Sequence, residues 1–333
     1  MSGGIAFLSF TARGAALAER LRTALGGTAD CAHGAEGFSL EAWTKEAFAQ
    51  RQALVFVGAV GIAVRAIAPN LRSKAADPAV VAVDEQGRFA VAVASGHLGG
   101  ANDLARAVAA VCGAVPVITT ATDVGGCFAV DEWARHQNCA VVQPRRIKAV
   151  SAKVLAGETI LVRSAWRVDG TPPKQVRLAD TGADVAVDLY QREEALCLAP
   201  RIVVLGVGCR RNTPREALEE HFSALCERLG LWKEAVCEVA TIDCKGDEPG
   251  LLDFCGAHGW PLRTYPAEAL RQVGGVFTAS AFVEKTVGVD NVCERCAVLA
   301  AGGPLLERKN AGGGVTMALA QKPYEMDWRW QDA

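Results

Sequence analysis

The sequence lacks an excess of either charge, a membrane-length apolar run and a recognisable leader. Its 333 residues include 35 Lys and Arg against 37 Asp and Glu, which gives a formal net charge of -2. A near-neutral chain has no global field to attract nucleic acid or an anionic membrane surface. No apolar run is long enough to span a bilayer, and the start of the chain has neither a basic stretch nor a small-residue cleavage site. We therefore expect a cytoplasmic protein that recognises charge locally and binds neither nucleic acid nor a membrane.

The sequence also lacks a disulfide framework. Its 12 cysteines are scattered along a long chain, as free thiols in a reducing compartment would be. Cys293 and Cys296 form a single CxxC pair, but a zinc site needs a second pair or a histidine pair at a defined spacing. We therefore expect buried structural cysteines and predict no metal site in the protein.

What the chain does have is apolar content and glycine. Half of its residues are hydrophobic and 34 are glycine, which at this length indicates two or three domains. Short apolar runs alternate with amphipathic helical patterns, as in a mostly parallel sheet that is wrapped by helices. In the first part of the chain the predicted strands are residues 4–10, 53–57, 80–83, 89–94 and 115–119.

The predicted fold is α/β, with two mostly parallel α/β units that are joined by a small irregular α+β connecting domain. The amino-terminal unit spans residues 1–140, the connecting domain 141–200 and the carboxyl-terminal unit 201–333. Basic residues and a Pro-Pro break mark the connecting domain, in which we expect strands at 159–162 and 185–189. In the carboxyl-terminal unit the predicted strands are 202–207, 236–242 and 261–265.

One helix of the carboxyl-terminal unit has a clear start signal. Thr213 is the predicted N-cap, Pro214 the first helical residue and Glu216 the partner in a capping box. The apolar residues that follow at helical spacing are Leu218, Phe222, Leu225 and Leu229. We expect them to form the buried face of this helix.

The most informative segment is the glycine-rich loop at residues 95–103, which contains His97 as its one imidazole. It follows a predicted strand, and the apolar residues after it have helical spacing. A strand that ends in such a loop before a helix presents backbone amides at the positive end of the helix dipole, where a carboxylate or an oxyanion is stabilised. Since loops at strand ends commonly carry functional groups, we favour a functional His97 over a structural one.

A second loop follows the strand at 115–119 and is rich in threonine. The carboxyl ends of parallel strands meet at one edge of a sheet, so this loop and the His97 loop are expected to line one crevice. Asp123 is then placed to orient a ring N–H of His97. Asn102 and Asp103 have a simpler interpretation as N-caps of the helix that follows the His97 loop.

A third loop, residues 206–211, follows a strand and precedes a helix, as a dinucleotide-binding fingerprint does. Arg211 occupies the place of the third glycine, which disfavours a nucleotide-binding oxidoreductase. Arg210 and Arg211 can instead bind carboxylates, with Lys245 after the next strand. A solvated loop with surface arginines is an equal alternative. Glu294 likewise has a simple structural interpretation, as the capping-box partner of Asn291.

Several motifs in the same order resemble the cobalt-precorrin-5A hydrolase family of anaerobic cobalamin biosynthesis. In the first part of the chain they are Gly61 to Arg65, Lys74 with Asp77 to Val80, Ser95 to Asn102 and Thr119 to Asp123. In the last part they are Leu205 to Arg211, Lys245 with Glu248, Ser280 to Val283, and Gly288 and Val289 with Val292 to Glu294. The resemblance is weakest between residues 141 and 200. Cys296 and the glycine run at 312–314 have no assigned role.

The resemblance implies a hydrolase that opens the ring A acetate δ-lactone of a cobalt-containing, ring-contracted tetrapyrrole and releases acetaldehyde. The product would be cobalt-precorrin-5B. The substrate carries its own cobalt, so no protein-bound cofactor is expected. Other enzymes of the pathway are expected partners for transfer of intermediates. A noncatalytic carrier of corrinoid intermediates remains an alternative, in which His97 would be dispensable or would bind cobalt.

On this interpretation His97 is the base, Asp123 its orienting partner, and the Gly99 and Gly100 amides donate to the oxyanion. Cations on both outer units would bind the carboxylate arms of the ring, which would then lie in a cleft between those units. The predicted substrate-binding residues are Arg65, Lys74, Ser95, Gly96, Gly99, Gly100, Asn102, Thr119, Thr120, Thr122, Cys209, Arg210, Arg211, Lys245, Ser280 and Glu294.

Overall fold

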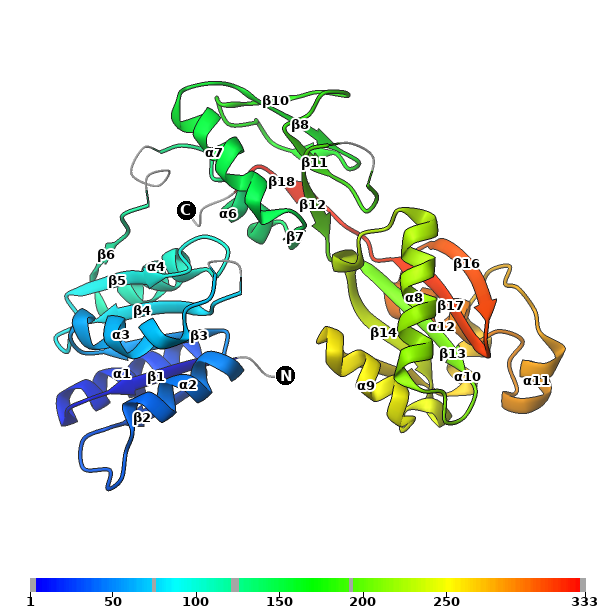
Figure 1. The fold of residues 1–333 in the computed structure, drawn as a ribbon, viewed down its shortest axis with the longest axis horizontal. Coiled ribbons are helices and arrows are strands. Elements are labelled where there is room, and N and C mark those ends of the chain that lie inside the picture. The colour runs from blue at the N-terminus through cyan, green and yellow to red at the C-terminus, as the bar shows by residue number, and fades with distance from the viewer. Residues whose placement is uncertain (1–3, 74–75, 121–125, 192–193, 330–333) are drawn as a thin grey trace.

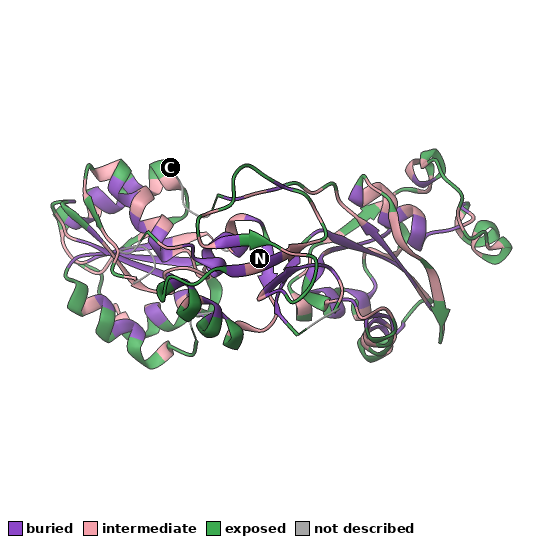
Figure 2. Cartoon of the chain, turned by 90° about the horizontal axis from the view of Figure 1, so that it is seen from above, coloured by how far each residue is buried: buried purple, intermediate pink, exposed green. Residues whose placement is uncertain are grey.

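The fold consists of three α/β units, of which the two outer ones flank the middle one (Figure 1). The computed structural model describes residues 4–73, 76–120, 126–191 and 194–329. Buried residues gather in the sheets, and exposed residues lie on the outer sides of the helices and in the loops (Figure 2). Within the described ranges, no helix has both the length and the apolar character needed to cross a membrane. The predicted α/β class is confirmed.

The amino-terminal unit contains a six-stranded sheet in the order β2-β1-β3-β4-β5-β6. Its strands are β1 (Ile5–Ser9), β2 (Thr28–Cys31), β3 (Ala53–Val57), β4 (Ala79–Val83), β5 (Phe89–Ala94) and β6 (Val115–Val117). The first four strands run parallel to one another, whereas β5 is antiparallel to β4 and parallel to β6. The loops after β5 and β6 therefore lie at the same end of the strands. This is the end of the sheet at which β4 begins.

Helices cover both faces of this sheet. They are α1 (Ala12–Leu25) and α4 (Ala101–Cys112) on one face, and α2 (Leu40–Gln50) and α3 (Val60–Ile67), continued by the 3₁₀ turn η1 (Ala68–Asn70), on the other. Successive side chains of a strand point to opposite faces. In β1, Phe7 accordingly belongs to the core under α1 and α4, and Leu8 to the core under α2 and α3. Such two-sided burial explains why the central strands are continuous apolar runs.

The middle unit is more regular than its sequence indicates. Its sheet has five strands in the order β10-β8-β11-β12-β7, of which only β7 is antiparallel to its neighbour. Its elements are α6 (Val130–His136), β7 (Cys139–Val141), η2 (Pro144–Arg146), α7 (Ile147–Leu155), β8 (Ile160–Ser164), β9 (Val168–Asp169), β10 (Val176–Leu178), β11 (Val185–Val187) and β12 (Leu196–Pro200). Its core includes Phe128, Val130 and Trp133, so this unit begins before the boundary predicted at residue 141.

The end of the chain returns to the middle unit. Strand β18 (Met326–Asp327) pairs in parallel with β9. The next residue, Trp328, stacks on Trp133 with 5.1 Å between the ring centroids, and the indole N–H of Trp133 donates to the carbonyl of Asp327 at 2.7 Å. The carboxyl-terminal unit was predicted to span residues 201–333. Its last described residues belong instead to the core of the middle unit.

The carboxyl-terminal unit contains a five-stranded sheet in the order β15-β14-β13-β17-β16. Its strands are β13 (Val203–Cys209), β14 (Val236–Ile242), β15 (Leu262–Tyr265), β16 (Leu305–Gly312) and β17 (Val315–Gln321). Its helices are α8 (Arg215–Leu229), α9 (Pro249–His258), α10 (Ala267–Gln272), α11 (Ala281–Val287) and α12 (Cys293–Ala301), with 3₁₀ turns η3 (Lys233–Ala235) and η4 (Asp243–Lys245). Helices α8 and α9 pack on one face, and α10 and α12 on the other.

The glycine run at 312–314 is the turn between β16 and β17. Gly313 and Gly314 have φ values of 59° and 83°. A two-residue hairpin turn that matches the twist of its strands requires positive φ at both positions, which favours glycine. The sequence did not predict this hairpin, although it forms two of the five strands of the sheet.

The start of α8 differs from the predicted capping box. The helix begins at Arg215, and Pro214 precedes it. The hydroxyl of Thr213 donates to the carbonyl of Arg210 at 2.8 Å. The predicted capping box of Thr213 and Glu216 is therefore wrong. The threonine hydroxyl bonds the turn after β13 and does not cap the helix. The apolar face is confirmed, since its first three members are fully buried: Leu218, Phe222 and Leu225.

Candidate functional site

The His97 loop is a compact turn between β5 and α4. Its first residue, Ser95, has a φ of 57°, which is unusual for a side chain with a Cβ. The amide of Gly100 donates to the carbonyl of His97 at 2.9 Å, and the amide of Asn102 donates to the carbonyl of Gly96 at 3.0 Å. In this conformation the Gly100 amide is therefore not available to an oxyanion. This corrects one of the two predicted amide donors, because the loop uses that N–H itself.

Two glycines of the loop are required by close contacts. A Cβ on Gly99 would lie 2.3 Å from the Cβ of Ser95, and a Cβ on Gly96 would lie 2.8 Å from the side-chain oxygen of Asn102. A Cβ atom essentially never lies this close to another heavy atom. A larger residue at 99 would therefore force the backbone of the turn apart, and one at 96 would displace the side chain of Asn102. These glycines therefore shape the loop, whether or not they also contact a substrate.

The central contact of the loop is between His97 and Asp131. The Nδ1 atom of His97 lies 3.1 Å from Oδ1 of Asp131, and both side chains are largely buried. Asp131 lies in the first turn of α6, so the middle unit supplies the partner of an amino-terminal histidine. A carboxylate on Nδ1 fixes the proton there and makes Nε2 the basic nitrogen. The sequence prediction missed Asp131. Asp123, which it chose as the orienting residue, lies outside the described residues.

A charged network surrounds this pair. Asp103 contacts Arg106 at 2.7 Å and the imidazole of His136 at 3.3 Å, and it also forms an ion pair with Arg135. Arg106 also lies 3.5 Å from Glu132, which is fully buried in α6. The network joins α4 to α6 and thereby fixes the position of the His97 loop against the middle unit. The N-cap of α4 is Gly100, so Asp103 does not have the capping role considered for it.

The loops after β5 and β6 meet, as the sequence predicted. The side-chain N–H of Asn102 donates to the hydroxyl of Thr120 at 3.0 Å, and Asn102 is buried. Thr119 is exposed beside it. Of the remaining residues predicted on this unit, Arg65 is exposed on α3, and two lie outside the described residues, Lys74 and Thr122.

The arginine loop after β13 carries two exposed guanidiniums, Arg210 and Arg211. Lys245 is less available, because its ammonium lies 2.7 Å from Glu248. Glu248 also accepts from the amide of Asn212 at 2.8 Å. The hydrogen bond from Lys245 is the largest influence on Glu248 and lowers the pKa of its carboxyl group. Arg211 also lies 3.8 Å from Glu248, so among the described residues Arg210 is the cation of this loop without a carboxylate partner.

Cysteines near this loop are not activated. Burial is the largest influence on Cys209, the last residue of β13, and it raises the pKa of the thiol. Burial also raises the pKa of Cys293 to about 11, and Cys296 is fully buried. All 12 cysteines are free thiols. Within the part of the chain that the structure describes, no group of three or more His, Cys, Asp or Glu side chains is arranged to bind a metal ion.

Glu294 has no exposed surface. Its carboxylate accepts from the amide and hydroxyl of Thr278, at 2.9 and 2.7 Å, and from the amide of Lys309 at 2.7 Å. Its own amide donates to the side chain of Asn291 at 2.8 Å, which is one half of the predicted capping box. In this structure Glu294 therefore orders the segment that precedes α11, in which Ser280 is half-buried.

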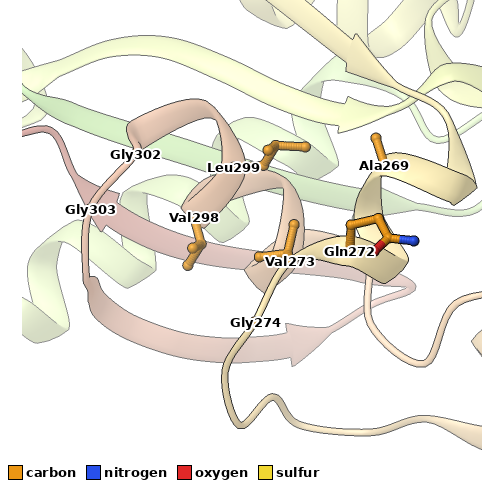
Figure 3. A pocket seen from close by; sticks show the side chains of 8 residues that line it. All are labelled: Ala269, Gln272, Val273, Gly274, Val298, Leu299, Gly302 and Gly303. Carbon is orange, nitrogen blue, oxygen red and sulfur yellow. The ribbon is translucent and has the colours of Figure 1, made fainter.

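An apolar pocket of about 380 Å³ lies between α10 and α12 (Figure 3). Its walls include Val273, Val298 and Leu299, and Gln272 is the only lining side chain with a polar group. No acid or base lines it, so it is not a candidate for proton transfer. The His97 loop remains the candidate active site, and the arginine loop a candidate anion site.

Two family models match segments of the chain that contain the His97 loop and the arginine loop. Residues 203–320 match the family model described as Cobalamin synthesis G C-terminus, and residues 42–123 match Cobalamin synthesis G N-terminal. Three relatives bear the name cobalt-precorrin-5A hydrolase, the third of them as a probable one. The protein of Salmonella typhimurium is 35% identical over 95% of this chain and 97% of its own length. The protein of Priestia megaterium is 32% identical over 84% and 80%, and that of Methanocaldococcus jannaschii 25% over 80% and 84%. The chain belongs to the cobalt-precorrin-5A hydrolase family.

Proposed function

We propose that this protein opens the ring A acetate δ-lactone of cobalt-precorrin-5A and releases acetaldehyde to give cobalt-precorrin-5B. Membership of the family supports the substrate class. The observation that carries the reaction is the His97–Asp131 contact of 3.1 Å inside a glycine-rich loop. It provides an oriented, largely buried imidazole, which is the usual general base near neutral pH.

The first step is hydrolysis of the lactone. Nε2 of His97 takes a proton from water as the water oxygen attacks the lactone carbonyl, and a tetrahedral oxyanion forms. The carbon–oxygen bond to the ring-side alcohol then breaks, and the imidazolium returns its proton to that oxygen. The products of this step are a free acetate arm and a hydroxyl group. The Gly99 amide remains a proposed donor to the oxyanion, since such donors stabilise developing charge.

The second step breaks a carbon–carbon bond. A base removes the proton of the new hydroxyl, the oxygen forms a carbonyl, and the electrons of the broken bond pass into the electron-poor macrocycle. The extruded carbon and its methyl group leave together as acetaldehyde. We assign His97 as the base of this step as well. The cobalt is part of the substrate, and the proposed chemistry of the protein needs no further metal.

In this proposal, exposed cationic side chains bind the carboxylate arms of the substrate ring. Arg65 on the amino-terminal unit and Arg210 and Arg211 on the carboxyl-terminal unit are exposed. Arg211 lies 3.8 Å from Glu248 and is 76% exposed, so its guanidinium can still reach a ligand. Guanidinium groups bind carboxylates through two parallel hydrogen bonds. We therefore propose that the ring lies between the outer units. Their position on either side of the middle unit is consistent with this (Figure 1).

The test is to mix the purified protein with cobalt-precorrin-5A and to trap acetaldehyde. We expect stoichiometric acetaldehyde, and a loss of at least about 10²-fold in kcat for His97→Gln, the lower range for removal of a general base. His33→Gln is the matched control, because His33 is exposed in a loop of the same unit. Tight binding without acetaldehyde would identify a carrier. Normal turnover by His97→Gln would remove His97 from the mechanism.

A further inference from the structure

A polar pocket of about 510 Å³, which we call the junction pocket, lies where the middle and carboxyl-terminal units meet. Asn138 of the middle unit lines one side of it. On the other side, Arg201 precedes β13, Lys233 and Glu234 lie in η3 before β14, and Trp260 precedes β15. These three strands run parallel to one another, so their starts share one end of the sheet. The junction pocket is therefore at the opposite end of this sheet from the arginine loop.

One wall of the junction pocket is aromatic. The imidazole of His258 stacks on the indole of Trp260, with 4.1 Å between the ring centroids and 7° between the ring planes. The indole also packs on Phe222 and Phe254, with centroid distances of 5.3 and 5.7 Å. Nε2 of His258 lies 2.8 Å from a carboxylate oxygen of Glu219, which orients the imidazole. Contacts within the protein therefore hold this wall in place, and it offers apolar ring surface to a ligand.

Two cationic side chains line the same pocket. Arg201 and Lys233 are both exposed. The ammonium of Lys233 donates to the hydroxyl of Ser223 at 3.1 Å, a neutral partner that leaves its charge uncompensated. Within the described ranges, neither cation forms an ion pair. Of the described residues that line the pocket, Glu234 is the one carboxylate, and it too is exposed. The pocket therefore has a surplus of positive charge, which attracts an anion.

The backbone of Arg201 is held against the middle unit. Its amide donates to the carbonyl of Asn138 at 3.0 Å, and the side-chain amide of Asn138 donates to the carbonyl of Arg201 at 3.4 Å. The amide of Lys322 donates to the carbonyl of the next residue, Ile202, at 2.9 Å. The guanidinium group therefore extends into the pocket from a fixed position at the junction of the two units.

The junction pocket adjoins the helix that orients His97. Asp131, in the first turn of α6, contacts His97, and Asn138 follows the end of the same helix. At 1.5 Å per helical residue, Asp131 and Asn138 are roughly 10 Å apart. The seven residues of β13 place the arginine loop roughly 23 Å from Arg201. Helix α9, which ends at His258, lies on the side of the carboxyl-terminal unit that faces the amino-terminal unit (Figure 1). Of these two cationic groups, the pocket is the one that adjoins α6.

We propose that the junction pocket binds a carboxylate arm of the tetrapyrrole, with Arg201 and Lys233 on the carboxylate and Trp260 against the apolar part of the ligand. The inference rests on the proposed function, since that supplies the ligand. A guanidinium binds a carboxylate through two parallel hydrogen bonds, and an ammonium adds a point charge. The lactone itself is uncharged, so cations cannot select it. An arm held in the pocket instead determines which edge of the ring faces His97.

The experiment measures binding and turnover separately. Cobalt-precorrin-5A is titrated under anaerobic conditions into wild type, Arg201→Ala, Lys233→Ala and the control Arg271→Ala, and binding is followed through the visible absorption of the ring. Arg271 is an exposed arginine of α10 that pairs with Glu268 at 3.0 Å. We expect each pocket variant to raise Kd about tenfold, the order of effect for one charge-assisted hydrogen bond, and the control to leave it unchanged. At saturating substrate kcat should stay near that of wild type, because the lost contact contributes equally to ground-state and transition-state binding.

The carboxylate of the pocket gives a change of opposite sign. Glu234→Gln keeps the size of the side chain and removes a negative charge that repels the arm. We expect this variant to lower Kd about threefold, the order of effect for one exposed charge. Thermal midpoints should be unchanged in all four variants, since the replaced side chains are exposed. A Kd for Glu234→Gln at or above that of wild type would show that the charge of the pocket does not act on the ligand.

The remaining outcomes separate the pocket from the reaction. Wild type that binds the substrate without releasing acetaldehyde would contradict the proposed function, and the Kd comparison would still test the pocket. Unchanged Kd for Arg201→Ala and Lys233→Ala, with normal acetaldehyde release, would overturn the pocket and leave the reaction intact. Inorganic phosphate is titrated into the same proteins to distinguish a small free anion from an arm of the ring. Phosphate binding that both variants lose, with substrate binding retained, would assign the pocket to a free anion and overturn the proposal.

Discussion

The Nδ1 atom of His97 lies 3.1 Å from Oδ1 of Asp131, and this contact crosses from the amino-terminal unit to the first helix of the middle unit. The imidazole belongs to a loop of the amino-terminal unit, and a helix of the middle unit supplies the carboxylate that orients it. The ion pairs of Asp103 with Arg135 and of Arg106 with Glu132 join α4 to α6 and hold the two helices in the same relation. The geometry of the proposed base therefore depends on how the two units pack, as well as on the loop itself.

Replacement of Asp131 should reveal its role in positioning His97. We expect Asp131→Asn to lower kcat for acetaldehyde release by about 10²–10⁴-fold, because an amide can select the wrong imidazole tautomer. Asp188→Asn is the control, since Asp188 is a buried carboxylate of the middle unit that pairs with Arg163 at 3.1 Å. Unchanged kcat for Asp131→Asn, at an unchanged thermal midpoint, would show that the carboxylate does not orient the base.

Ser95 should be replaceable by glycine with a gain in stability. Its φ is 57°, and its buried hydroxyl has no hydrogen-bond partner among the described residues. The left-handed conformation costs roughly 1–2 kcal/mol with a Cβ, against about 0.5–1 kcal/mol of extra chain entropy for glycine. We expect Ser95→Gly to increase the unfolding free energy by about 1 kcal/mol, measured by urea unfolding.

Asn138→Gly is the control for this measurement, because Asn138 has a φ of 52° and asparagine tolerates this conformation well. Its gain should be smaller. If Ser95 also contacts substrate, Ser95→Gly will raise KM while it raises stability. A less stable Ser95→Gly protein would mean that the serine side chain supports the turn.

The cysteine pair should behave as buried thiols and not as a metal site. Burial raises the pKa of Cys293 to about 11, so little thiolate exists at neutral pH. Cys244 is exposed. We expect iodoacetamide to modify Cys244 in the native protein and to spare Cys293 and Cys296, as mass spectrometry of the peptides would show. Stoichiometric zinc that is lost in Cys293→Ser but kept in Cys244→Ser would contradict this.

The ion pair of Glu248 with Lys245 should make the stability of the protein depend on pH in the acid range. The folded protein lowers the pKa of Glu248 below its ordinary value of 4.5, chiefly through the hydrogen bond from Lys245. A lowered pKa means that the stabilisation is complete above the ordinary value and is lost as the pH falls through the lowered one. We expect Glu248→Gln to lower the thermal midpoint at pH 7, and the difference from wild type to shrink as the pH falls below 4.5 and through the lowered pKa. A difference that persists in acid would assign the effect to packing.

The sequence predicted those elements whose signals are local. Strand β14 was placed at 236–242 and has these bounds, and the apolar runs predicted as strands at 80–83 and 89–94 are β4 and β5. The edge strand β2 was missed, because half of its short, polar sequence is exposed. Strands β16 and β17 were missed because the glycines of their turn had no assigned role.

The site was predictable only in part. The meeting of Asn102 and Thr120 followed from two loops at strand ends, and the distance of 3.0 Å confirms that they meet. Asp131 was not foreseen, because its position depends on how α6 packs against the His97 loop and no spacing in the sequence encodes that contact. Glu294 was chosen as a substrate contact by resemblance, and in the structure its buried carboxylate accepts hydrogen bonds from Thr278 and the amide of Lys309.

The return of the chain end to the middle unit has a consequence for folding. Because β18 and Trp328 complete a core that begins at Phe128, the carboxyl-terminal unit is an insertion within a discontinuous domain. During synthesis the middle unit cannot close until the inserted unit has left the ribosome, and it is then the last of the three to mature. Removal of the final ten or so residues would therefore unfold the centre of the molecule and spare the unit that precedes them in sequence.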